Sequence, residues 1–314
     1  MKCKIIFIGN SIVAGYPFSK GSSFVGVLRK ILKGDGGDAL PQPDFAKSVG
    51  FSIVNKGVNG DTTAGIAARL QADVLEHEPD VVFVMTGTND FIYRDATPEE
   101  AFENLEQIAA RIEALPGEAG KTDGMGNPAE AGKTDGACNP AEAGKTDGMG
   151  NLGEAGKTDG MGNPAEVSSL GDSGNPAEVS SLGDSGNAAE ASNLGDSSKS
   201  GDADRPGNPG RRCVPVYITP IPVDAGKAEF MWMAGCGISY DAVNRDIDRL
   251  SELIRNSGRL YVDMNRLFAG YAAEIGDVDL VYLDGLHPLK AGHEFMAGEI
   301  VSFIEQNLTR LVSK

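Results

Sequence analysis

The chain has 314 residues, 40% of them hydrophobic, and a formal net charge of −17. Such an acidic chain lacks the basic stripe that binds a phosphate backbone, and anionic membranes do not attract it. No stretch of the sequence approaches the roughly 20 apolar residues of a membrane helix. We therefore expect neither a nucleic-acid partner nor insertion into a membrane.

The cysteines give no sign of a metal site or a disulfide framework. They are Cys3, Cys138, Cys213 and Cys236, and they form no CxxC pair and no cluster with histidine at zinc spacing. No metal or other cofactor is therefore predicted. The first apolar run is too short for a signal peptide and leads directly into Gly9, so we expect a cytoplasmic protein.

Strand and helix patterns alternate along the first part of the chain. Strand patterns lie at residues 4–8, 51–54 and 80–85, and helix patterns lie at residues 24–32, 66–75 and 97–115. The last of these helices begins with a capping box from Thr97 to Glu100, with Pro98 at the first helical position.

A tandem repeat with a period of 12 residues follows. Its units begin at Glu118, Glu130, Glu142, Glu154, Glu166, Glu178 and Glu190. The units are rich in glycine and contain few large apolar side chains, so they cannot offset the entropy lost on folding. We predict that residues 117–212 are a disordered insertion in one discontinuous domain, made of residues 1–116 and 213–314.

The alternation resumes after the repeats. Strand patterns lie at residues 214–218 and 260–262, and helix patterns lie at residues 239–256 and 290–307. Strands that alternate with helices pair in parallel, and strands that are apolar throughout belong to a sheet covered on both faces. The sequence therefore predicts a three-layer α/β domain.

Polar loops containing glycine follow the predicted strands. They are residues 9–11, 55–62 and 87–90, with a fourth loop at residues 284–288 near the end of the chain. Ligands bind at the carboxyl ends of strands in an open parallel sheet. We therefore expect these four loops to meet at one edge.

The loops contain the groups that acyl transfer requires. Ser11 is a candidate nucleophile, His287 a candidate base, and Asp284 is close enough in sequence to orient the imidazole. Gly60 offers an unobstructed backbone N–H and Asn89 a side-chain amide. Together with the N–H of Ser11, these two donors would form an oxyanion hole.

Each of these residues also has a simpler interpretation. Ser11 can cap the helix that follows it, and Gly60 can serve only to form a turn. Asn89 can bond to the backbone of its own loop, and Asp284 can cap a turn at Gly285.

Other polar and aromatic residues near the motifs have less specific roles. Asp61 and Asp90 are expected to anchor their loops by hydrogen bonds. His77 lies near a helix end and His293 lies within the final helix pattern, so neither is the expected base. The residues that either line an acyl pocket or pack in the core are Tyr16, Phe18, Phe91, Tyr93, Trp232 and the stretch from Met231 to Met233.

The four blocks resemble those of the SGNH (GDSL) hydrolase family. Gly9–Ile12, Gly60–Thr62, Gly87–Asp90 and Asp284–Pro288 are similar to the family's Ser, Gly, Asn and His blocks, in the same order. The resemblance implies a flavodoxin-like parallel sheet of order 2-1-3-4-5 and metal-independent esterase, lipase or thioesterase activity. One departure is Asn10, which stands where the family usually has Asp and changes the charge beside Ser11.

We therefore expect hydrolysis of (thio)esters through an acyl-enzyme. The substrates expected first are small acyl esters or lysophospholipids, and the alternative is O-deacetylation of carbohydrates. A non-hydrolytic binding or scaffold protein on the same fold is the alternative from another class.

Overall fold

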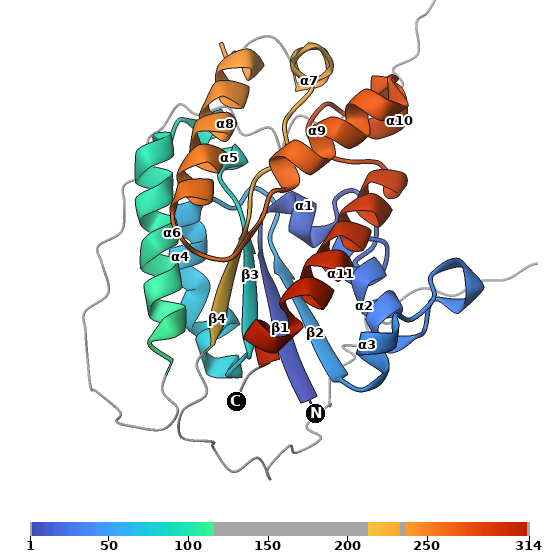
Figure 1. Cartoon of the computed structure of the whole chain (residues 1–314). Helices are drawn as coiled ribbons and strands as arrows, with labels where there is room; N and C mark the ends of the chain where they lie inside the picture. Colours follow the sequence, from blue (N-terminus) through green and yellow to red (C-terminus); the bar gives the residue numbers. More distant parts are fainter. Residues whose placement is uncertain (1, 116–212, 233–236, 313–314) are drawn as a thin grey trace, which may run out of the picture. The chain divides into compact units, whose positions relative to one another are not determined.

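A parallel sheet of five strands forms the middle layer of the structure (Figure 1). The computed structural model describes residues 2–115, 213–232 and 237–312, so the predicted insertion at 117–212 lies outside the described residues. The strands are β1 (Lys2–Gly9), β2 (Gly50–Gly57), β3 (Val81–Met85), β4 (Val214–Ile218) and β5 (Tyr261–Val262). Their order is β2-β1-β3-β4-β5, which confirms the predicted order.

The register of the sheet brings the carboxyl ends of its central strands to one level. Gly9, at the end of β1, pairs with Gly57 of β2 on one side and with Met85 of β3 on the other. The loops that follow these three strands therefore leave the sheet side by side. This is the edge at which open parallel sheets bind ligands.

Alternate side chains of the strands point to two separate hydrophobic cores, as the pleat of a strand requires. In β1, Ile5 and Phe7 belong to one core, whereas Ile6 and Ile8 belong to the other. All four are fully buried. The continuous apolar run of β1 thus reflects a sheet that is covered on both faces, as the sequence predicts.

Helices cover both faces (Figure 1). The first core packs against α2 (Phe24–Lys33), α9 (Met264–Ile275) and α11 (Lys290–Val312). The second core packs against α4 (Thr63–Asp73), α6 (Pro98–Glu113) and α8 (Tyr240–Asn256). Within the described residues, no helix has both the length and the apolar character that crossing a bilayer would require.

Polar caps fix where these helices begin. The Thr97 hydroxyl accepts from the N–H of Glu100, and the Glu100 side chain accepts from the N–H of Thr97, which confirms the predicted capping box. Ser23, Thr62 and Ser239 cap α2, α4 and α8 in the same way through their hydroxyl groups. Each cap satisfies an N–H that the first turn of a helix leaves unpaired.

Shorter elements join the main ones at the edges of the sheet. They are α1 (Ser11–Ala14), α3 (Asp44–Lys47), α5 (Thr88–Tyr93), α7 (Ala225–Trp232), α10 (Val278–Val281) and the 3₁₀ turns Gly37–Ala39 and Leu75–His77. Of these, α1 and α5 directly follow β1 and β3 at their carboxyl ends.

Candidate active site

Ser11 is held at the first position of a short helix. Strand β1 ends at Gly9, and the Asn10 side chain then accepts a hydrogen bond from the N–H of Ile12 at 3.1 Å, which caps α1. Asn10 is almost fully buried, and Ser11 is only 8% exposed. An amide oxygen caps a helix as well as a carboxylate does, so the cap is kept without a negative charge beside Ser11.

The loop that carries His287 is organised by Asp284. One carboxylate oxygen, Oδ1, accepts from the backbone N–H groups of Leu286 at 2.9 Å and His287 at 2.8 Å. The other, Oδ2, lies 2.7 Å from Nδ1 of the His287 ring. Asp284 therefore both caps the turn at Gly285 and contacts the imidazole.

The electrostatics of this pair favour an ionised Asp284. Burial alone would raise the pKa of Asp284, but the hydrogen bonds and charge of His287 and the N–H of Leu286 hold it below its usual value. An ionised carboxylate accepts from Nδ1–H and so leaves Nε2 of His287 as the acceptor.

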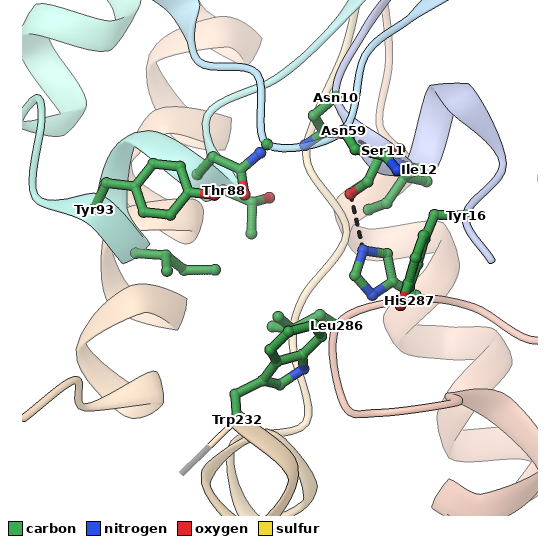
Figure 2. A pocket seen from close by; sticks show the side chains of 13 residues that line it. Asn10, Ser11, Ile12, Tyr16, Asn59, Thr88, Tyr93, Trp232, Leu286 and His287 are labelled. Carbon is green, nitrogen blue, oxygen red and sulfur yellow. Dashed lines mark hydrogen bonds between the residues drawn. The ribbon is translucent and has the colours of Figure 1, made fainter. Parts of the chain in front are cut away.

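Ser11 Oγ lies 2.8 Å from Nε2 of His287 (Figure 2). With Nε2 as the acceptor, the Ser11 hydroxyl donates to the ring. A continuous chain of hydrogen bonds therefore runs from Ser11 through His287 to Asp284, and all three residues are buried. The structure thus brings together a hydroxyl, an imidazole and a carboxylate that lie at opposite ends of the sequence.

Asn89 and Gly60 lie at the same cavity as Ser11 and His287. The Asn89 side-chain amide donates to the backbone carbonyl of Asp61 at 2.9 Å. An amide NH₂ has two hydrogens, so this bond fixes the side chain and leaves one N–H for another acceptor. Gly60 has a φ of 76°, in the left-handed region that favours glycine.

A buried contact between Asp90 and Thr63 joins α5, which carries Asn89, to the start of α4, which follows the loop of Gly60. The Asp90 carboxylate accepts from the Thr63 hydroxyl at 2.5 Å and from its backbone N–H at 3.1 Å. Burial raises the pKa of Asp90 to about 6. These contacts agree with the anchoring role expected for Asp90, whereas Asp61 is anchored by Arg69.

The cavity has a volume of about 150 Å³ and a largely apolar wall. It is lined by Asn10, Ser11, Ile12, Tyr16, Asn59, Gly60, Thr88, Asn89, Ile92, Tyr93, Trp232, Leu286 and His287. The rings of Tyr16 and Trp232 lie beside the His287 ring, with centroids 4.6 Å and 6.1 Å away (Figure 2). Aromatic side chains therefore shield the imidazole from solvent.

The aromatic residues that the sequence singles out have different positions. Tyr16, Tyr93 and Trp232 line the cavity, but Phe91 is buried in the core below it. Phe18 packs against His293 instead, and Met231 is half exposed. Met233 lies outside the described residues.

Sequence reasoning assigned no role to five residues of the cavity wall, namely Ile12, Asn59, Thr88, Ile92 and Leu286. Three are apolar residues next to motif residues, where sequence alone does not distinguish the core from a pocket wall. Position relative to the motif was the available signal, because Ile12 follows Ser11 and Leu286 precedes His287.

The other two histidines are not at the cavity. His293 is completely buried in α11, where its Nδ1 accepts from the N–H of Phe24 at 3.3 Å. Burial and the nearby His287 lower the pKa of His293 to about 4. His77 ends a 3₁₀ turn, and its carbonyl accepts from the Lys4 ammonium. Among the described residues, no cluster of His, Cys, Asp or Glu is arranged to hold a metal ion.

The N-terminal part of the chain resembles known esterases in sequence. The sequence model of the GDSL-like Lipase/Acylhydrolase family matches residues 7–139. Esterase TesA of Pseudomonas aeruginosa is 30% identical over 110 residues, which cover 35% of this chain and 48% of that protein. The acetylxylan esterase of Geobacillus stearothermophilus is 36% identical over 119 residues, which cover 36% of this chain and 52% of that protein. The chain thus spans about half the length of the curated relatives it matches.

Solved structures share the fold. A lipase/acylhydrolase from Enterococcus faecalis aligns with a TM-score of 0.51 at 16% identity, covering 97% of this chain and 96% of that chain. A variant of a Geobacillus acetyl-xylooligosaccharide esterase aligns with the same TM-score and identity, covering 96% of this chain and 94% of that chain. At this identity the likeness concerns the fold alone. The sheet order, the four sequence blocks and the match of residues 7–139 agree in their support for the GDSL-like lipase/acylhydrolase family, also called the SGNH hydrolases.

Proposed function

We propose that the protein hydrolyses carboxylic esters through an acyl-enzyme formed on Ser11. The observation that carries this proposal is the buried chain of hydrogen bonds from Ser11 Oγ through His287 to Asp284, which borders a cavity. A hydroxyl, an imidazole and an ionised carboxylate in this sequence of contacts are the parts of a serine nucleophile activated by a base.

In the first step, Nε2 of His287 takes the proton of the Ser11 hydroxyl while Oγ attacks the ester carbonyl carbon. The carbonyl oxygen becomes an oxyanion, and Asp284 stabilises the imidazolium that forms. His287 then returns the proton to the alcohol oxygen, the bond from carbon to that oxygen breaks, and the alcohol leaves.

In the second step, water takes the place of the alcohol. His287 removes one proton from the water while the water oxygen attacks the acyl carbon. His287 then gives this proton to Ser11 Oγ as the bond between Oγ and the acyl carbon breaks. The carboxylic acid leaves and the free serine is restored. In both steps the N–H groups of Ser11 and Gly60 and the amide of Asn89 donate to the oxyanion, which is the largest single contribution in many acyl transfers.

The size of the cavity favours short acyl groups. A closed apolar cavity of roughly 150 Å³ accommodates a molecule about as large as benzene, and the cavity beside Ser11 has about this volume. An acyl group of about six heavy atoms would fill this volume, although the cavity beside Ser11 is open on one side. A lysophospholipid chain would extend beyond the cavity.

A second candidate is the removal of acetyl groups from carbohydrates. Two observations favour it, namely the small cavity and the similarity to an acetylxylan esterase at 36% identity. An acetyl group fits the acyl side, while a sugar would occupy the open side of the site as the alcohol.

An ester panel tests both candidates. p-Nitrophenyl esters from acetate to palmitate, together with acetylated xylose, are to be assayed with the wild-type protein and with Ser11→Ala. We expect hydrolysis that is fastest for the short acyl groups and absent in the Ser11→Ala variant. Full activity of Ser11→Ala would remove Ser11 as the nucleophile.

Labelling with a fluorophosphonate probe separates an enzyme from a binding protein on the same fold. An activated serine reacts with the probe, so rapid labelling of the wild-type protein and none of Ser11→Ala is expected. A wild-type protein that neither reacts with the probe nor turns over any ester would favour the non-hydrolytic alternative.

A further inference from the structure

Arg69 of α4 contacts two backbone carbonyls, at the ends of β1 and β2, and two carboxylates. Its Nε and Nη2 contact Oδ2 of Asp61 at 2.8 Å and 2.6 Å. Nη2 also donates to the carbonyl of Gly9 at 3.2 Å, and Nη1 donates to the carbonyl of Lys56 at 2.9 Å. The last contact is from Nη1 to Oδ2 of Asp73 at 2.7 Å. Four of these contacts are hydrogen bonds, and the contact of Nη2 with Asp61 is part of an ion pair.

The segments that this guanidinium joins are those that carry the oxyanion donors. Gly9 ends β1 two residues before Ser11. Asp61 directly follows Gly60, and its carbonyl accepts the hydrogen bond that fixes the Asn89 side chain. The loop of Ser11, the loop of Gly60 and the amide of Asn89 are therefore tied together through a single side chain.

Asp61 and Arg69 are both largely buried, and burial raises the pKa of Asp61 while the hydrogen bond and charge of Arg69 lower it. The Arg69 side chain is 19% exposed and that of Asp61 is 8% exposed, so solvent screens their attraction much less than it would screen a surface pair. A charge-assisted contact of this kind also fixes direction, because the guanidinium is planar and its donors diverge at set angles.

We propose that Arg69 is a positioning residue for the oxyanion hole, which sets the distance between the Ser11 and Gly60 N–H groups and the amide of Asn89. An oxyanion hole lowers the barrier only if its donors already lie at hydrogen-bond distance from the developing charge. All three donors are in loops or at a helix start, which a strand alone does not fix in place. Arg69 touches neither the cavity nor the reacting atoms, so it acts only through these loops.

This role predicts a specific kinetic effect. If the donors shift, the transition state loses stabilisation while the substrate in the ground state loses little, because the oxyanion exists only in the transition state. We expect Arg69→Met to lower kcat about 10- to 100-fold, which is the cost of misplacing catalytic groups by about 1 Å. KM should stay within about twofold of the wild-type value.

The test depends on the proposed ester hydrolysis, so each variant is compared with the wild-type protein and Ser11→Ala on the best short ester of the panel. Arg69→Lys keeps the charge but has a single nitrogen, so it should recover only part of kcat. Asp61→Ala should reproduce the loss, and the double variant Arg69→Met/Asp61→Ala should lose no more than the larger single effect.

Arg111→Met is the matched control. Arg111 of α6 also donates to a backbone carbonyl of α4, that of Ala67 at 2.7 Å, but it lies on the surface and has no contact with the site loops. The kcat of Arg111→Met should equal that of the wild type. Circular dichroism and the Tm of every variant show whether it is folded at the assay temperature, and Arg69→Lys provides the measurement if Arg69→Met does not fold.

The outcomes separate the two proposals. An active wild type with folded Arg69 variants that match Arg111→Met in kcat would overturn the positioning role and leave the esterase intact. If kcat falls by the same factor as the fraction of folded protein, the positioning role is also overturned, because Arg69 would then only stabilise the fold. A wild type without esterase activity would overturn the proposed function and the role of Arg69 with it.

Discussion

The Asp90 carboxylate accepts two kinds of hydrogen bond from one residue, Thr63, whose hydroxyl and backbone N–H both point to it. Asp90 is nonetheless so deeply buried that its pKa is raised to about 6. The pKa of His293, which is also buried, is lowered to about 4. Two buried groups therefore have pKa shifts of opposite direction in the same range of pH.

The two shifts should nearly cancel in the pH dependence of stability. Between pH 6.5 and 4 the folded protein holds a proton on Asp90 that the unfolded chain has released, so stability rises as the pH falls. The unfolded chain holds a proton on His293 that the folded protein lacks, so stability falls as the pH falls. Shifts of about two units correspond to roughly 3 kcal/mol each at most.

Single variants should expose each contribution. Asp90→Asn keeps an acceptor for Thr63 without titrating, and it should lose about 2 kcal/mol of unfolding free energy relative to the wild type between pH 6.5 and 4.5. His293→Asn keeps an acceptor for the N–H of Phe24 and should gain a similar amount over the same interval. Urea unfolding at several pH values measures the unfolding free energy of each variant. If that free energy changes with pH just as it does in the wild type, the pKa shifts of Asp90 and His293 are contradicted.

Asn89→Ala tests the proposed oxyanion donor. Loss of one such donor costs about 10²–10³-fold in kcat in comparable sites, and we expect a loss of this size with KM nearly unchanged. Steady-state kinetics with a short p-nitrophenyl ester measure it. The matched control is Asn307→Ala, since Asn307 donates its amide to a carbonyl within α11, that of Phe303. An unchanged kcat in Asn89→Ala would leave the hydrogen bond to Asp61 as the sole role of this side chain.

Asp284→Asn tests how His287 is oriented. The amide oxygen can still accept from the backbone N–H groups of Leu286 and His287, so the loop should keep its shape. The amide nitrogen, however, cannot accept from Nδ1–H, which favours the wrong tautomer of the imidazole. We expect kcat to fall about 10³–10⁴-fold with a Tm close to that of the wild type. A kcat within tenfold of the wild-type value would show that Asp284 only caps its turn.

Removal of residues 117–212 tests the proposed discontinuous domain. Glu113, at the end of α6, and Cys213, just before β4, border one cavity, so the two ends that the segment joins are near each other. Connections between a helix and a strand are commonly 2–6 residues long, and a linker of about six Gly and Ser residues should suffice. We expect the shortened protein to fold and to keep its kcat, with circular dichroism and the ester assay as measurements. An insoluble or unfolded product would contradict the proposed boundaries.

The fold could be predicted where elements are long or have a regular pattern. The helix patterns in residues 24–32, 97–115, 239–256 and 290–307 agree with α2, α6, α8 and α11, because each buries one face and has a polar face outside. The same reasoning missed α9, which has 12 residues, and α7, which has eight. It also missed α1 and α5. These helices have four and six residues, too few to show a periodicity, and they carry motif residues that are buried on several sides.

The sequence predicted the motif residues of the candidate site, but it did not predict the residues that hold them in place. Ser11 and His287 follow from the positions of their loops in a parallel sheet. Arg69 gives no such signal, because one arginine on a helix is usually a solvated residue of the outer face. Its importance depends on the distance between the ends of β1 and β2, which only the folded chain reveals.

The hydrogen bond between Ser11 and His287 spans 276 positions of the sequence. During synthesis the imidazole is therefore added 276 residues after the hydroxyl. Because domains fold as units, a growing chain that has not yet reached residue 287 carries an inert hydroxyl. Under the proposed mechanism, a message cut short before residue 287 would yield no active esterase.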